Sequence, residues 1–106
     1  MKILTVGHRY ELDNFERKDQ LGQVLQFIEK VPVDGGTELE TLRDGTTNED
    51  VLRMLLDRLN YLQSKFPCRE NAIAITHVET ALLWLEYRTT KRVAQQVEGK
   101  QIAHES

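Results

Sequence analysis

The chain has 106 residues, enough for one domain with its own core but few enough that oligomerisation would add stability. Apolar residues make up 40% and charged residues 29%, the balance of an ordinary globular protein. The net charge of -3 argues against DNA or RNA polymers as partners, because such partners are held mainly by basic surfaces.

Residues 1–44 predict a small antiparallel β-sheet. Between residues 2 and 12, Leu4, Val6, Tyr10 and Leu12 lie at even positions, an alternation typical of a half-buried strand. Residues 23–31, rich in Val, Phe and Ile, predict a second strand, and the charged stretch 13–22 predicts the connection between the two. A Gly-Gly turn then leads into residues 37–42, which predict a short, exposed edge strand.

Residues 45–94 predict an antiparallel hairpin of two helices. Thr46 and Thr47 are each followed three positions later by an acidic residue, so both are candidates for the N-cap of the first helix. Pro67 should end that helix, and a second one follows over residues 72–92. The expected apolar face of the first helix is Val51, Leu55, Leu59, Leu62 and Phe66, and that of the second is Ile75, Val78, Leu82 and Leu85.

Both helices carry additional residues beside these faces. On the second helix this flank is Ala74, His77, Ala81, Trp84 and Arg88, and on the first it is Met54, Arg58 and Tyr61. The face and flank of the second helix together cover roughly half of its circumference, more than one partner helix needs. Two interpretations remain open: the flanks complete a core against the sheet, or their aromatic and arginine side chains line a pocket between subunits.

Residues 95–106 are polar and predict a loosely held tail, and we expect residues 1–106 to form a single domain. Cys68 has no second cysteine with which to form an internal disulfide, which is typical of a reducing compartment. The N-terminal residues do not resemble a signal peptide, and no apolar run is long enough to span a membrane. We therefore expect a cytoplasmic protein without a membrane partner.

The sequence contains no arrangement of residues suited to breaking a bond. His8, His77 and His104 lack the spacing of metal ligands, and Cys68 has no neighbouring histidine. The glycines at 35–36 are not followed by the Lys-Ser or Lys-Thr of a phosphate-binding loop. We therefore expect a binding protein rather than an enzyme, with no catalytic residue, metal or cofactor.

Asn71, Arg88 and Tyr61 are suited to ligand binding, but each also has a structural explanation. Asn71 would cap the second helix, or its amide would read a base edge or a ribose hydroxyl. Arg88 would be a solvated charge favoured by the helix dipole, or its guanidinium would stack on a nucleobase or bind phosphate oxygens. Tyr61 would pack beside Phe66, or it would stack on a nucleobase, which contributes about 1–3 kcal/mol.

Three segments of the chain resemble the phage Thoeris anti-defence family of cyclic-nucleotide sponges. They are GTTNEDVLRMLLDRL, PCRENAIAITHVETALLWLEYRTTKR and VEGKQ, which together span residues 45 to 101. The helical half also resembles the hairpin shared with phage anti-CBASS sponges, and GHRYEL and LQFIEK fit the small sheet that precedes it. The resemblance implies an α+β fold in which a short antiparallel sheet is followed by a two-helix hairpin.

The resemblance also implies a function and a set of binding residues. The implied ligand is glycocyclic ADP-ribose, a cyclic ADP-ribose isomer that the protein would bind without cleaving, as a homo-oligomer that is a dimer or a hexamer made of three dimers. Tyr61 matches the aromatic that stacks on adenine, Asn71 the asparagine that opens the second helix, and Arg88 the arginine of an Arg-Thr motif. Arg43 matches an arginine before the first helix. Family hexamers also have separate sites for cyclic oligonucleotides, and the sequence leaves open whether this chain has them.

Two rival functions remain open at this point. One is a protein-binding helical hairpin that inhibits a host enzyme through its wide apolar face. The other is a phosphodiesterase that destroys the signal, against which the lack of a metal cluster or a paired base and nucleophile in the sequence counts.

Overall fold

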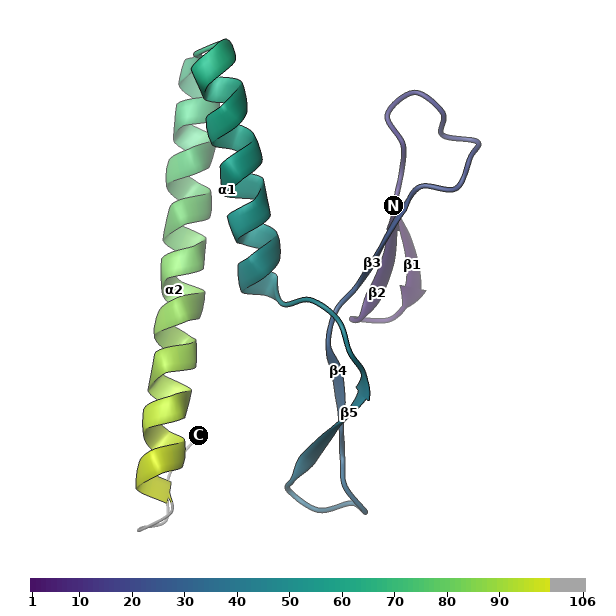
Figure 1. Ribbon diagram of the computed structural model, residues 1–106, viewed down its shortest axis with the longest axis vertical. Helices are drawn as coiled ribbons and strands as arrows, with labels where there is room; N and C mark the ends of the chain where they lie inside the picture. The colour runs from purple at the N-terminus through teal and green to yellow at the C-terminus, as the bar shows by residue number, and fades with distance from the viewer. Residues whose placement is uncertain (100–106) are drawn as a thin grey trace. The chain divides into compact units, whose positions relative to one another are not determined.

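The computed structural model describes residues 1–99 and divides the chain into two compact units, Met1–Asn48 and Glu49–Ser106. Within the described residues, the first unit contains five strands and the second contains two helices (Figure 1). The predicted α+β fold is therefore confirmed. Neither of these two helices combines the length and the apolar character that crossing a membrane requires. The expectation of a single domain over 1–106 stays a prediction.

The first sheet has three antiparallel strands in the order β1-β2-β3. They are β1 (Lys2–Thr5), β2 (Arg9–Leu12) and β3 (Gln23–Gln26). The single strand expected over residues 2–12 is thus a hairpin. Gly7 adopts a positive φ of 77° in its turn, and the His8 amide donates to the Thr5 carbonyl at 3.0 Å. Alternation of apolar residues is the same on both arms, so the pattern did not reveal the turn.

A separate two-stranded sheet pairs β4 (Glu29–Pro32) with β5 (Leu39–Arg43). The strand expected over residues 23–31 is therefore divided into β3 and β4, because the chain changes pairing partners at Phe27. Phe27 forms an isolated bridge with Thr46. The expected turn between β4 and β5 is confirmed, with Gly35 at a φ of 73°. Every residue of β5 is exposed, as expected of an edge strand.

The helical hairpin consists of α1 (Asn48–Lys65) and α2 (Arg69–Gly99). The start of α1 places Thr47 at the N-cap position and thereby selects one of the two expected caps. On α2 the expected face is confirmed, with Leu82 buried and Ile75, Val78 and Leu85 half-buried. On α1, Val51, Leu59 and Leu62 of the expected face are half-buried, as are Leu52 and Leu56, whereas Leu55 and Phe66 of that face are 40% and 79% exposed. The sequence did not distinguish Leu55 from Leu56, because two adjacent leucines fit two helical registers equally well.

Both ends of α2 differ from the prediction. The helix begins at Arg69, and the Asn71 amide donates to the Cys68 sulfur at 3.4 Å, so Cys68 rather than Asn71 is in the N-cap position. Gln63 fixes this connection by exchanging two hydrogen bonds of 3.1 Å with the Cys68 backbone. At the other end, α2 continues to Gly99, so residues 95–99 of the expected tail are helical, since no proline interrupts them. Residues 100–106, including His104, lie outside the described residues.

Gly22 gives a direct test of the β2–β3 register. A Cβ atom at this position would collide with the Leu12 carbonyl oxygen at the end of β2. We expect Gly22→Ala to lower the free energy of unfolding by about 1–3 kcal/mol, the usual cost of overpacking. Leu21→Ala is the matched control, because Leu21 is exposed and its replacement should change stability by less than about 0.5 kcal/mol. Equal denaturation midpoints for Gly22→Ala and Leu21→Ala would contradict the register.

Candidate functional site

The four predicted binding residues are divided between the two units. Tyr61 lies late in α1, Asn71 is the third residue of α2, and Arg88 lies farther along α2. Arg43 is the last residue of β5 in the first unit, where its Nη1 atom lies 3.0 Å from Oε1 of Glu29. Part of the positive charge of Arg43 is therefore balanced by a carboxylate.

Tyr61 presents an aromatic ring to solvent. Its side is opposite that of Leu52, Leu56 and Leu59, which face α2, because the helix turns by about 100° per residue. The residue is 55% exposed, and the Nζ atom of Lys65 lies 5.6 Å from the centroid of its ring. The alternative in which Tyr61 packs beside Phe66 is not favoured, because both residues are exposed. A ring in this position is available for stacking.

Asn71 is half-buried near the turn between the helices. Its backbone amide bonds to Cys68, but its side-chain amide makes no hydrogen bond to any residue in the range 1–99. The proposed capping role of the Asn71 side chain is therefore wrong. A primary amide without a protein partner keeps both donors and an acceptor for a ligand.

Arg88 has an exposed guanidinium that forms no ion pair with the described part of the chain. Two aromatic residues precede it on α2, Trp84 by one turn and Tyr87 by one residue. Their rings form an edge-to-face pair with centroids 6.1 Å apart, and the residues are 66% and 61% exposed. Arg88 is thus an uncompensated cation beside an exposed aromatic pair, a combination suited to binding an anion that carries a flat ring.

One chain alone does not bring these helical residues together. Asn71 and Arg88 are separated by about 25 Å along the axis of α2, at 1.5 Å per residue. The contact between Arg53 and Glu86 shows which residues of the two helices lie side by side. Tyr61 lies eight residues from Arg53 toward the turn, and Arg88 lies two residues from Glu86 in the other direction. At 1.5 Å per residue, Tyr61 and Arg88 are therefore about 15 Å apart along the hairpin. A small cyclic nucleotide cannot reach from Asn71 to Arg88 of the same chain.

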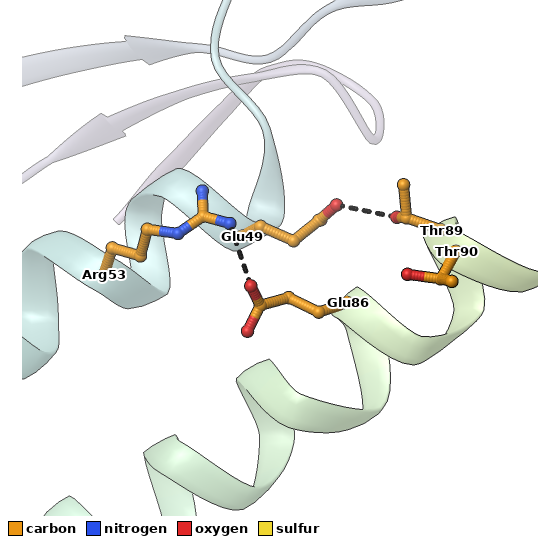
Figure 2. Close-up of a pocket in the computed structure, with 5 residues that line it drawn as sticks. All are labelled: Glu49, Arg53, Glu86, Thr89 and Thr90. Atoms are coloured by element: carbon orange, nitrogen blue, oxygen red, sulfur yellow. Dashed lines mark hydrogen bonds and ion pairs between the residues drawn. The ribbon is translucent and has the colours of Figure 1, made fainter. Parts of the chain in front are cut away.

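A shallow pocket of about 180 Å³ lies between the two helices, near the start of α1 (Figure 2). Arg53 donates to Glu86 at 3.4 Å, and Thr89 donates to Glu49 at 3.2 Å, so both polar pairs join α1 to α2. The remaining lining residue is Thr90. Because the lining contains two carboxylates and a single guanidinium that already has a partner, this pocket does not suit a phosphate. Its two polar pairs, Arg53–Glu86 and Glu49–Thr89, link the helices and are called the clasp below.

The clasp should contribute little to stability. The side chains of Arg53 and Glu86 are about half exposed, and exposed ion pairs contribute about 0.2–1 kcal/mol. We expect a double-mutant cycle of Arg53→Ala and Glu86→Ala, measured by denaturant unfolding, to give a coupling energy in this range that falls as salt is added. A coupling above about 2 kcal/mol that persists at high salt would contradict this interpretation.

Within residues 1–99, no three His, Cys, Asp or Glu side chains converge in a way that could hold a metal ion.

The sequence interpretation named Trp84 on the flank of the second helix but did not single out Lys65 or the pairing of Trp84 with Tyr87. Both could have been found from helical spacing, because Lys65 follows Tyr61 by four residues and Tyr87 follows Trp84 by three. The clasp residues could not have been predicted, because their pairing depends on how α1 is aligned with α2, and the sequence does not determine that alignment.

Two comparisons place the chain among known proteins. The family model described as "Acb2/Tad1, hairpin domain" matches residues 23–90, more than half of the chain. Over 57 residues the chain is 53% identical to a protein of Bacillus phage SBSphiJ7 named Thoeris anti-defense 1. That match covers 53% of this chain and 40% of the relative, so the chain spans less than half the length of that protein.

Proposed function

The chain belongs to the Acb2/Tad1 hairpin domain family, and on this basis we propose that it is a phage anti-defence protein that sequesters a cyclic ADP-ribose isomer, glycocyclic ADP-ribose. The name of its phage relative, Thoeris anti-defense 1, supports a role against Thoeris immunity in the cytoplasm of an infected cell. The observation that carries the proposal is the helical hairpin, which exposes Tyr61 and the unpaired guanidinium of Arg88.

The binding pocket is built from two copies of the chain. Tyr61 of one copy stacks on adenine, and Arg88 of the other copy binds the pyrophosphate, with Asn71 bonding to the ribose or base. The separations of about 15 and 25 Å within one chain support this arrangement, because a second, antiparallel copy supplies the missing residue. Arg43 contributes a second positive charge. Separate sites for cyclic oligonucleotides are expected only if three dimers assemble into a hexamer.

The apolar surface of α2 supports a second copy. Leu82 is buried on the side that faces α1, and Ile75, Val78 and Leu85 are half-buried there. Ile73, Trp84 and Tyr87 lie on the opposite side and are exposed. A helix that is apolar on two opposite sides is typical of one packed between two partners, and an exposed aromatic pair is a typical interface anchor. The biological unit is therefore a homodimer or a hexamer of three dimers.

Sequestration requires tight binding without chemistry. Holding a signal at nanomolar concentration takes roughly -12 kcal/mol, which favours a ligand enclosed by two chains over one bound on an open surface. No catalytic step is part of this function, and the ligand leaves unchanged when the protein unfolds.

The test is mass spectrometry of the nucleotide released by heating purified protein that has been incubated with glycocyclic ADP-ribose. Recovery of the intact ligand in proportion to the number of sites supports the proposal. A linear product would indicate the phosphodiesterase instead. The absence of any bound nucleotide would favour the protein-binding hairpin that inhibits a host enzyme.

A further inference from the structure

Tyr61 and Lys65 form a pair on the exposed side of α1. They are four residues apart, so they are neighbours on one helix face, and the Lys65 ammonium lies 5.6 Å from the centre of the Tyr61 ring. Both residues are exposed, and Lys65 has no ion pair with the residues that the structure describes. A flat ring and an unpaired cation are thus presented together.

The charges around Tyr61 favour an anion on one side of the ring. Arg58 precedes Tyr61 by three residues and is rotated about the helix to nearly the same side as Lys65, since 100° per residue places the two about 20° apart. Asp57 lies on the other flank of Tyr61, about 80° away from Lys65. A nucleotide that stacks on the ring with its phosphates toward Arg58 and Lys65 avoids the carboxylate and meets two cations.

We propose that Lys65 is a ligand-binding residue whose ammonium binds a phosphate oxygen of the nucleotide stacked on Tyr61. The inference rests on the proposed function, since it takes the ligand to be a purine nucleotide with a pyrophosphate. In the free protein the ammonium stays over the ring, an exposed cation–π contact that a phosphate readily replaces because the charge-assisted hydrogen bond is stronger. Lys65 thus moves only a short distance from the ring to the phosphate.

Calorimetric titration with glycocyclic ADP-ribose tests the proposal. Lys65→Gln should weaken binding about tenfold, the loss expected for one exposed charge-assisted hydrogen bond. Lys65→Arg should retain most of the affinity, because the guanidinium also binds phosphate. Lys18→Gln is the matched control: it removes the same charge from an exposed position in the first unit and should bind like the parent. Added salt should weaken the parent more than Lys65→Gln.

The outcomes separate this inference from the function on which it rests. If the parent binds glycocyclic ADP-ribose and Lys65→Gln binds it equally well, the role of Lys65 is wrong and the proposed function stands. If Lys65→Arg loses as much affinity as Lys65→Gln, charge is not what matters, and the inference also fails. If the parent does not bind this nucleotide, both are overturned.

Discussion

Replacing Arg88 with alanine should weaken binding of glycocyclic ADP-ribose about 100-fold or more, because the pyrophosphate then loses a bidentate, charge-assisted contact in an enclosed site. Tyr61→Ala should also weaken binding, because it removes a stacking contact of about 1–3 kcal/mol. Neither change should alter helix content or molecular mass, because both side chains are exposed and neither faces the partner helix. Calorimetry, circular dichroism and light scattering measure these three properties.

Each substitution has a control variant on the same helix. Arg92→Ala removes the same charge one turn beyond Arg88 and should leave affinity unchanged within about threefold. Tyr61→Phe keeps the ring and should retain stacking. If Arg88→Ala and Tyr61→Ala both bind like the parent, the site is located incorrectly.

The second large effect is expected for Trp84→Glu, which should convert the oligomer into a monomer. Trp84 and Tyr87 form an exposed aromatic pair on the side of α2 opposite α1. A carboxylate in the centre of an interface has to be desolvated without a partner, at a cost of several kcal/mol. Ligand binding should disappear with the dimer, because the proposed pocket takes Tyr61 from one chain and Arg88 from the other.

Phe15→Glu is the control for this change. It also replaces an exposed aromatic with an acid, but in the connection between β2 and β3. It should leave the mass measured by light scattering unchanged. A Trp84→Glu protein that keeps the parent's mass would show that this side of α2 is not the interface.

Much of the fold follows from periodicity, and the exceptions have specific causes. The α2 face was predictable because Ile75, Val78, Leu82 and Leu85 offer a single helical register. The α1 face was predictable only in part: Val51, Leu59 and Leu62 are half-buried as expected, but adjacent leucines allow two registers and only the partner helix selects between them. The hairpin turn at Gly7 was missed because alternation continues through both arms.

The candidate site was predictable in its residue types but not in its geometry. Asn71 was expected at an N-cap, yet Cys68 occupies that position, because the helix begins as soon as Pro67 no longer constrains the chain. Spacing identified Tyr61 and Arg88 as residues on helix flanks, but their separation depends on how α1 is aligned with α2, which the Arg53–Glu86 and Glu49–Thr89 contacts fix. In the proposed function, that alignment is the reason why each pocket takes residues from two copies.

Mixing two defective variants tests most directly whether each pocket is shared between copies. Tyr61→Ala and Arg88→Ala are unfolded together, refolded as a mixture and titrated with glycocyclic ADP-ribose. Mixed dimers contain one pocket with both side chains intact, so about a quarter of the parent's sites should return at nearly parental affinity. If the mixture binds no better than either variant alone, while the parent treated in the same way binds fully, Tyr61 and Arg88 do not meet across two chains.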